Sequence, residues 1–188
     1  GLTPKSVWLP ADVDSDRLRD ALRPFGDAPL VLKDFVKSRK HEWAEACFIP
    51  RASDLEAVRR VVRRFLELQG DTLAGGLVFR EFVEFESAGR HPKSSMPLAR
   101  EHRLFWLDGR LLLSFPYWSD LGQTGDGPPP GTFDTVAAKI GSRFFTMDVA
   151  KRKDGAWMIV ELGDGQVAGL PDETSAEALY QALQGAGL

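Results

Sequence analysis

Two acidic residues near the end of the chain, Asp148 and Glu161, have a spacing that suits the binding of a divalent cation. They lie in segments of strand-like composition, 144–153 and 156–162, on either side of Asp154-Gly155. Asp-Gly between two such segments predicts a β-hairpin with a two-residue type I′ turn. Pairing outward from this turn places Asp148 directly opposite Glu161. Like charges that face each other across a sheet repel, so the pair indicates a site for a hard cation such as Mg²⁺, or else a solvated pair on an exposed sheet face.

Three basic residues could bind the phosphate groups that accompany Mg²⁺ in many proteins. Lys33 ends the apolar run 30–32, and Lys37 follows in a polar segment. Lysines in such positions can bind phosphates as point charges, although solvated lysines are the alternative. Arg103 alternates with large apolar residues in 101–106, so its side chain points to one face of a strand. There it could stabilise charge on a transferring phosphoryl group or form a structural ion pair.

Composition excludes several other classes of protein. No P-loop or Gly-x-Gly-x-x-Gly pattern is present, and the three histidines lack metal-ligand spacing. The net charge of -3 gives no general attraction to nucleic acid, and we interpret the arginines of the predicted helix 54–69 as its solvated side. A single cysteine, Cys47, excludes an intramolecular disulfide. No segment resembles a membrane span or a signal peptide, so a cytoplasmic protein is expected.

The elements that must position these residues are helices interrupting a mainly antiparallel sheet, which indicates the α+β class. Ser53 and Glu56 have the spacing of a capping box at the start of one helix, and Gly70 would end it. Asp108-Gly109 predicts a second hairpin with a two-residue turn. The predicted strands are 6–10, 29–33, 77–86, 102–107, 110–115, 144–153 and 156–162, and the predicted helices are 14–22, 54–69, 132–140 and 175–183.

Taken in order, four segments resemble the ATP-grasp superfamily, in a divergent form. Segment 29–33 is similar to the strand whose terminal lysine lies at the nucleotide, and 77–83 is similar to the hinge strand that recognises adenine. Segment 101–109 resembles the family's Glu-x-Arg-x-Phe…Asp-Gly strand. Segments 145–149 and 160–163 resemble the two strands that carry metal ligands. The resemblance implies an α+β fold of two small lobes, approximately 1–75 and 76–188, with the nucleotide between them.

The same resemblance implies an ATP- and Mg²⁺-dependent ligase that joins a carboxylate to an amine through an acyl phosphate. Its partners would be small-molecule or peptide acids and amines, and no contact with nucleic acid or membrane is expected. A non-catalytic ATP-binding module and a structural interaction domain are the alternatives. The implied residues are Arg103 and Lys37 for catalysis, Lys33, Lys37, Glu81, Phe82, Val83 and Glu86 for the nucleotide, and Asp148, Glu161 and Asp164 for the metal.

Two departures from the family pattern affect these expectations. Gly163 stands where the family's Glu-x-Asn has an asparagine, so Asp164 is the residue expected to supply a further metal contact. The usual glycine-rich phosphate loop is replaced by 34–41, in which Lys37 would supply charge in place of backbone amides. Members also usually carry an N-terminal substrate lobe, and the first residues here resemble the segment after it. The chain is therefore expected to be a piece of a longer protein.

Overall fold

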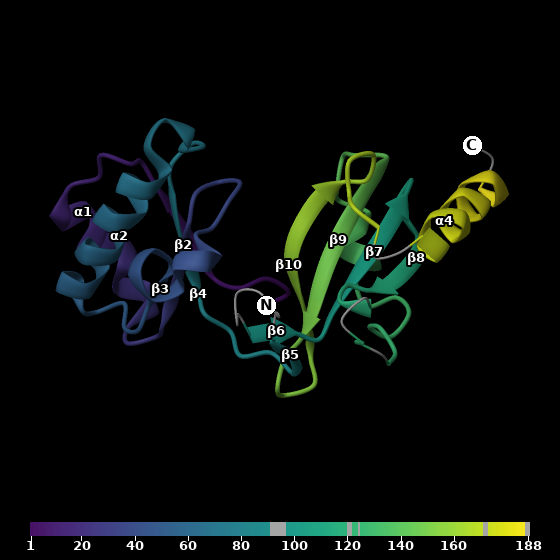
Figure 1. Cartoon of the computed structure of the whole chain (residues 1–188), viewed down its shortest axis with the longest axis horizontal. Coiled ribbons are helices and arrows are strands. Elements are labelled where there is room, and N and C mark those ends of the chain that lie inside the picture. The colour runs from purple at the N-terminus through teal and green to yellow at the C-terminus, as the bar shows by residue number, and fades with distance from the viewer. Residues whose placement is uncertain (91–96, 120–121, 124, 171–172, 187–188) are drawn as a thin grey trace. The chain divides into compact units, whose positions relative to one another are not determined.

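The computed structural model describes residues 1–90, 97–119, 122–123, 125–170 and 173–186. The chain forms two compact units, Thr3–Val83 and Glu84–Leu188 (Figure 1). The division falls after Val83 and not near residue 75, so the strand at 77–81 belongs to the N-terminal unit. Both units combine helices with antiparallel sheets, which confirms the α+β class.

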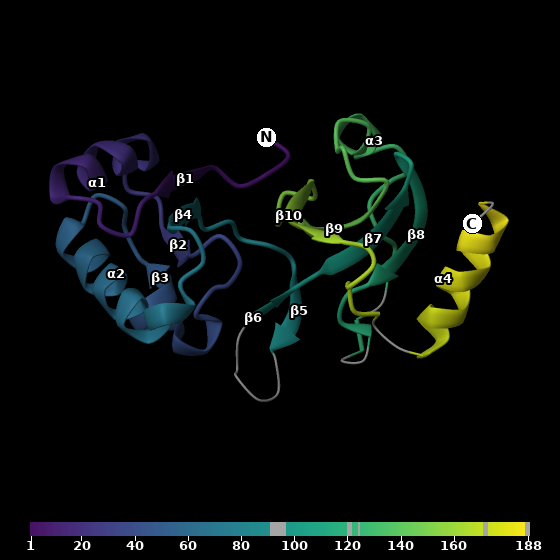
Figure 2. The ribbon, with the colours of Figure 1, turned by 90° about the horizontal axis from the view of Figure 1, so that it is seen from above.

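The N-terminal unit is a four-stranded antiparallel sheet covered by two helices. Its strand order is β1 (Ser6–Leu9), β4 (Leu77–Glu81), β2 (Leu30–Lys33) and β3 (Phe48–Ile49). Helices α1 (Ser15–Leu22) and α2 (Leu55–Gln69) lie on the same side of this sheet (Figures 1 and 2). Short 3₁₀ turns occupy Arg23–Phe25, Lys40–Glu42 and Gly70–Thr72, and a π-helical turn occupies Trp43–Cys47. The core lies between helices and sheet and includes Leu22, Leu30, Val58, Phe65 and Phe79.

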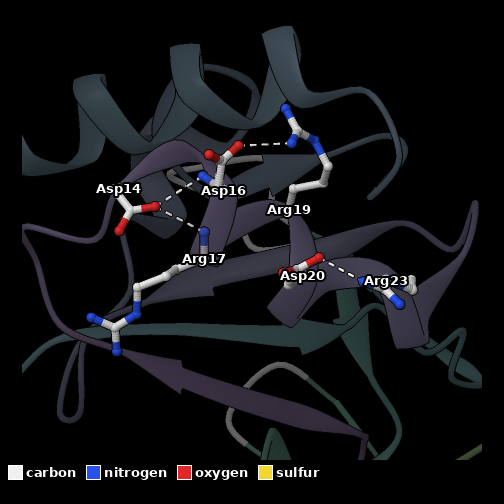
Figure 3. A network of polar contacts seen from close by, with 6 residues as sticks. All are labelled: Asp14, Asp16, Arg17, Arg19, Asp20 and Arg23. Carbon is white, nitrogen blue, oxygen red and sulfur yellow. Dashed lines mark hydrogen bonds and ion pairs between the residues drawn. The ribbon is translucent and has the colours of Figure 1, made fainter.

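The starts of the two helices follow from capping side chains. Asp14 accepts hydrogen bonds from the backbone N–H groups of Asp16 and Arg17, at 3.0 and 2.9 Å, as predicted for α1 (Figure 3). In α2 the cap is Asp54, which accepts from the N–H of Ala57 at 3.0 Å. The predicted cap, Ser53, is wrong because its hydroxyl is hydrogen-bonded to Asp27 instead.

The C-terminal unit is built on a second four-stranded antiparallel sheet. Its order is β10 (Trp157–Asp164), β9 (Phe144–Lys151), β7 (Glu101–Leu107) and β8 (Arg110–Pro116). A separate ribbon pairs β5 (Ser87–Arg90) with β6 (Pro97–Ala99). Helix α3 (Asp134–Ala137) is shorter than the predicted 132–140, and α4 (Glu173–Gly185) packs beside β8 (Figures 1 and 2). The apolar core of this unit includes Leu104, Trp106, Phe133, Met147, Val149, Trp157 and Ile159.

The two Asp-Gly sequences form different turns. Asp108 and Gly109 have φ values of 48° and 74°, and Leu107 pairs with Arg110, so this hairpin has the predicted type I′ turn. At Asp154-Gly155 only the glycine has a positive φ, 88°. The N–H of Arg152 donates to the carbonyl of Ala156 at 2.8 Å, which leaves three loop residues. The predicted two-residue turn is therefore wrong at this position, and the register next to it differs by one residue.

None of the helices in the described part of the chain combines the length and the apolar composition that crossing a membrane requires. The predicted strand 77–86 is also shorter than expected. β4 ends at Glu81, and of the residues that follow, Phe85 forms only an isolated bridge with Arg152.

Candidate functional site

A β-bulge in β10 brings Glu161 opposite Asp148. Near the turn, Ile159 pairs with Val149, and both side chains belong to the apolar core. The register then shifts at Val160, so that Glu161 pairs with Asp148 on the other face of the sheet. Without this extra residue Glu161 would share the face of Ile159, because side chains alternate along a strand. The predicted pairing of the two acidic residues is thus confirmed, although it depends on a bulge and not on the predicted turn.

Arg103 neutralises Asp148 directly. The two residues pair across β7 and β9, and the Nε and Nη2 atoms of Arg103 donate to the two carboxylate oxygens of Asp148 at 2.8 and 2.7 Å. Asp148 is only 3% exposed. These hydrogen bonds, more than any other influence, raise the pKa of Arg103 above its ordinary value. Arg103 therefore forms the structural ion pair that the sequence left as one of its two roles, and it forms it inside the predicted site.

Two further contacts hold the Arg103 guanidinium. Its Nη1 atom donates to the carbonyl oxygen of Gly169 at 2.8 Å. Its Cζ atom lies 4.7 Å from the ring centroid of Tyr117, in cation–π geometry. Tyr117 was missed by the sequence analysis because nothing in a loop following β8 indicates which strand its ring will face. We call Arg103, Tyr117, Asp148 and Glu161 the carboxylate–arginine site.

Asp164 does not join Asp148 and Glu161 in this structure. Its Oδ1 atom accepts from the backbone N–H of Gln166 at 2.8 Å, which closes a local turn after β10. In the described ranges, no three His, Cys, Asp or Glu side chains form a group that could hold a metal ion. Gly163 lies opposite Thr146, and a Cβ atom at position 163 would be 2.7 Å from the Thr146 hydroxyl oxygen. A larger residue at position 163 would therefore require Thr146 to move.

A buried carboxylate organises the loop that carries Lys37. Asp34 is 1% exposed, and its Oδ1 atom accepts from the N–H groups of Val36 and Lys37 at 2.7 and 2.5 Å. Its Oδ2 atom accepts from the Gln69 side chain at 2.6 Å and from the N–H of Ala74 at 3.3 Å. Burial alone would raise the pKa of Asp34, but these hydrogen bonds outweigh it and lower the pKa. The sequence analysis gave Asp34 no role.

The two lysines lie on either side of this anchor. Lys33 ends β2 and is half-buried, and its backbone forms an isolated bridge with Ser38. Lys37 is exposed. Because Asp34 fixes the intervening turn, the structure holds both lysines close together in the N-terminal unit, as a pair of phosphate contacts would require.

The predicted adenine segment lies at the end of β4. The backbone N–H of Glu81 donates to the carbonyl of Lys5, and that of Phe82 donates to the carbonyl of Pro29, both at 2.8 Å. These two N–H groups are therefore engaged within the unit. The Phe82 ring packs edge-on against Phe48 and Trp43, with centroids 5.3 and 6.0 Å apart, and all three rings are half-buried.

Glu86, the predicted ribose contact, takes part in ion pairs within the C-terminal unit. Its carboxylate contacts the Lys151 Nζ atom at 2.9 Å and the Arg100 Nη1 atom at 3.3 Å. The hydrogen bond from Lys151 is the largest of the influences that lower the pKa of Glu86. Glu86 is thus ionised and held in one orientation, with oxygen lone pairs still able to accept further hydrogen bonds.

His102, next to Arg103 in β7, is expected to make the stability of the C-terminal unit depend on pH. It is 3% exposed, and burial followed by the charge of Arg100 lowers its pKa, with Asp126 and Gly125 acting weakly in the opposite direction. An imidazole whose pKa is lower in the folded state contributes stability that is present above about pH 6.5 and lost as the pH falls through the folded pKa. Urea denaturation should therefore show a decreasing free energy of unfolding below pH 6.5.

The variant His102→Gln, which has no titrating ring, should lose most of that slope. An unchanged slope in this variant would show that other groups cause it. The exposed His41 provides a matched control, since His41→Gln should leave the slope as it is in the parent protein.

Comparison with known proteins agrees with this geometry. A family model described as an ATP-grasp domain, the third family of its clade, matches residues 24–183. No curated protein matches the chain. Among solved structures, the chain resembles the ATP-grasp ligase PsnB complexed with a phosphomimetic variant of minimal precursor, Mg and ADP. The TM-score is 0.55 and the identity is 18%, over 97% of this chain and 51% of PsnB.

Two other solved structures share the fold. D-cycloserine synthetase DcsG has a TM-score of 0.54 and 17% identity, over 98% of this chain and 65% of DcsG. Cdc123 from Schizosaccharomyces pombe has a TM-score of 0.51 and 14% identity, over 94% of this chain and 84% of Cdc123. The chain thus spans about half the length of PsnB. Since the family model covers most of the sequence, the chain belongs to this family of ATP-grasp domains.

Proposed function

We propose that this chain binds Mg-ATP and serves an ATP-dependent ligase that joins a carboxylate to an amine. The main support is the convergence of Asp148, Glu161 and Arg103 on one face of the C-terminal sheet. Membership of the ATP-grasp family and a fold shared with the ligases PsnB and DcsG support ligase activity in general. PsnB was crystallised with Mg and ADP, which supports the same ligands here.

The donor atoms of the carboxylate–arginine site fit Mg²⁺. A bound ion of this kind would neutralise phosphate charge, and two carboxylates completed by water and phosphate oxygens are a usual ligand set for it. Each oxygen of Asp148 accepts one hydrogen bond from Arg103, which leaves lone pairs on both for a cation. Glu161 is exposed and has no cation within ion-pair distance among the described residues, so its carboxylate is accessible.

The remaining predicted residues would bind the nucleotide. Lys33 and Lys37, fixed around Asp34, would contact phosphate oxygens, with Lys37 also stabilising charge during transfer. The backbone of Glu81, Phe82 and Val83 would contact adenine through groups other than the engaged N–H groups of Glu81 and Phe82. The half-buried ring of Phe82 offers apolar surface to the base, and Glu86 would accept hydrogen bonds from the ribose.

In the proposed reaction, a carboxylate oxygen of the substrate attacks the γ-phosphorus of ATP, ADP leaves, and an acyl phosphate forms. The amine nitrogen then attacks the acyl carbon and releases phosphate, which leaves an amide. Arg103 would stabilise the negative charge on the transferred phosphoryl group, since the protein contributes chiefly positioning and electrostatic stabilisation to such transfers. The substrates would be small-molecule or peptide acids and amines.

A second candidate function is an ATP-binding module without turnover. Gly163 favours it, because this glycine removes a side chain next to the Asp148–Glu161 pair and Thr146 fills the space. This function predicts Mg-dependent ATP binding without ADP release for any acid and amine. The ligase predicts ADP and phosphate as products, whereas formation of AMP would contradict both.

The thermal stability of the protein with ATP should show whether the carboxylate pair binds Mg²⁺. A ligand that binds only the folded state raises Tm by mass action. ATP with Mg²⁺ is expected to raise the Tm of the parent protein, and Glu161→Gln is expected to abolish the Mg-dependent part. Because Glu161 is exposed, this variant should change the stability of the free protein by less than about 0.5 kcal/mol.

Two comparison variants sharpen this measurement. Glu177→Gln, at an exposed glutamate of α4, should keep the full Mg-dependent rise. Asp164→Asn tests the predicted third ligand, since a loss of the rise would assign Asp164 to the metal and its retention would leave Asp148 and Glu161 as the pair. A Mg-dependent rise that persists in Glu161→Gln would contradict the proposed metal site.

A further inference from the structure

Tyr117 contacts Arg103 in a way that no other residue of the carboxylate–arginine site does. Arg103 has five N–H donors, and the bonds to Asp148 and Gly169 use three of them in the plane of the guanidinium. The Tyr117 ring faces the guanidinium with 4.7 Å between the Cζ atom and the ring centroid. A contact with a ring face uses no N–H donor. It can therefore persist while the donors change partners.

The backbone of Tyr117 is fixed to the strand that carries Arg103. Its N–H donates to the carbonyl of Glu101 at 2.8 Å, and the buried side chain of Gln123 donates to the same carbonyl at 2.6 Å. The ring also packs edge-on against Trp118, with centroids 4.8 Å apart. Glu101 and Arg103 are both in β7. The ring is thus held in place from its own backbone and from a neighbouring ring, and its position does not depend on Asp148.

The surroundings of the Tyr117 hydroxyl place this side chain within the site. Burial raises its pKa, the charge of Arg103 lowers it, and the carboxylates of Asp148, Glu101 and Glu161 raise it further. The phenol therefore lies near the same charged groups that would surround a bound cation and phosphate. A residue at the edge of the fold with a purely structural role would not combine these neighbours with a face-on contact to the arginine.

We propose that Tyr117 is a positioning residue for Arg103, whose ring keeps the guanidinium at the site while Asp148 and the transferred phosphoryl group compete for its N–H donors. The proposal rests on the proposed function for the identity of the ligand. It does not depend on that function for the contact itself. Asp148 fixes Arg103 by charge in the free protein, and Tyr117 fixes it by a contact that a bound cation at Asp148 does not weaken.

The test uses Tyr117→Phe, which keeps the ring face, and Tyr117→Leu, which removes it. Calorimetry would measure the affinity for Mg-ADP alone and for Mg-ADP with aluminium fluoride, a mimic of the transferred phosphoryl group. Aluminium fluoride should tighten binding to the parent protein. Tyr117→Leu should lose about tenfold of that gain while the affinity for Mg-ADP alone changes by less than about twofold, and Tyr117→Phe should keep the gain. Tyr180→Leu, at the exposed second tyrosine of the chain, is the matched control.

Three results would overturn the proposal: full retention of the gain in Tyr117→Leu, an equal loss in Tyr117→Phe, or an equal weakening of both affinities. A ligand-free measurement separates this proposal from the proposed function. The rate at which phenylglyoxal modifies Arg103, followed by peptide mass spectrometry, should rise several-fold in Tyr117→Leu and stay low in Tyr117→Phe. If the parent protein binds no Mg-ADP, the proposed function fails, and the labelling rate alone then decides on Tyr117.

Discussion

Replacing Asp148 with asparagine is expected to lower the free energy of unfolding by about 3 kcal/mol. The substitution keeps the shape of the side chain but removes the charge that both donor groups of Arg103 contact, at 2.8 and 2.7 Å. The two side chains are 15% and 4% exposed, so the guanidinium would remain largely buried without a counter-charge. Removing one member of such a pair is costly because the other member cannot regain its hydration. Urea denaturation, with hydrogen exchange to localise the effect, measures this loss.

The chain contains a matched control for this prediction. Asp108 and Arg143 form an ion pair with the same two-pronged geometry, at 2.7 and 2.9 Å, but their side chains are 52% and 74% exposed. Asp108→Asn should therefore cost less than about 1 kcal/mol, since solvent screens exposed pairs. Asparagine also tolerates the positive φ of 48° at this turn. Similar losses in Asp148→Asn and Asp108→Asn would show that burial does not control the strength of the Arg103–Asp148 pair.

A double-mutant cycle would isolate the interaction itself. Arg103→Gln combined with Asp148→Asn should be more stable than the sum of the two single losses predicts, with a coupling of about 2 kcal/mol. This cycle also bears on the nucleotide experiment. Because Asp148→Asn disturbs the fold on its own, a loss of ATP binding in that variant would not identify a metal ligand. Glu161→Gln, whose carboxylate is exposed, is the better test of the metal site.

Replacing Asp34 with alanine should destabilise the N-terminal unit by about 3 kcal/mol or more. Four donors lose their acceptor at once, namely the N–H groups of Val36, Lys37 and Ala74 and the amide of Gln69. Gln69 is itself buried, so its amide cannot easily turn to solvent. The loop that carries Lys37 would lose its anchor to the end of α2. Urea denaturation would measure the loss, and proteolysis within 34–41 would report the loosened loop.

Asp14 is the matched control for Asp34. It too accepts from the N–H groups two and three residues ahead, but it is exposed and contacts no other element of the fold (Figure 3). Asp14→Ala should cost about 1 kcal/mol, as for other helix caps. An Asp34→Ala loss no larger than this would show that the bonds to Gln69 and Ala74 contribute little.

Acid should act through the same group. Because the pKa of Asp34 is lowered in the folded protein, its contribution to stability is fully present above about pH 4, the value for an unfolded chain, and is lost as the pH falls through the folded pKa. Asp34→Asn should remove this part of the acid dependence. A parent protein whose N-terminal unit keeps its full stability below pH 3 would contradict the assignment.

Local patterns predicted much of the fold and the approximate place of the site. The cap of α1 at Asp14, the end of α2 at Gly70 and the hairpin at Asp108-Gly109 follow from rules that involve only neighbouring residues. The same rules failed at Asp154-Gly155, where Asp-Gly fits both a two-residue turn and a three-residue loop. The local sequence does not decide between these turns, because the pairing of the flanking strands selects one.

The pairing of Asp148 with Glu161 shows how a correct contact can follow from an incorrect register. The longer loop shifts the hairpin by one residue, and the bulge at Val160 shifts it back before Glu161 is reached. The bulge allows Trp157 and Ile159 to face the apolar core while Glu161 faces Asp148. Strict alternation would have forced all three onto one face.

By itself, the sequence determined the α+β class, the hairpin that carries the two carboxylates and the resemblance to the ATP-grasp superfamily, because periodicity, turn residues and motif spacing are local properties. The tertiary structure alone decided that Asp148 is neutralised by Arg103, that Tyr117 covers the guanidinium, and that Asp34 anchors the Lys37 loop. Each of these contacts joins residues from separate elements. Such contacts depend on which strands and loops become neighbours, and that is settled by packing over the whole unit.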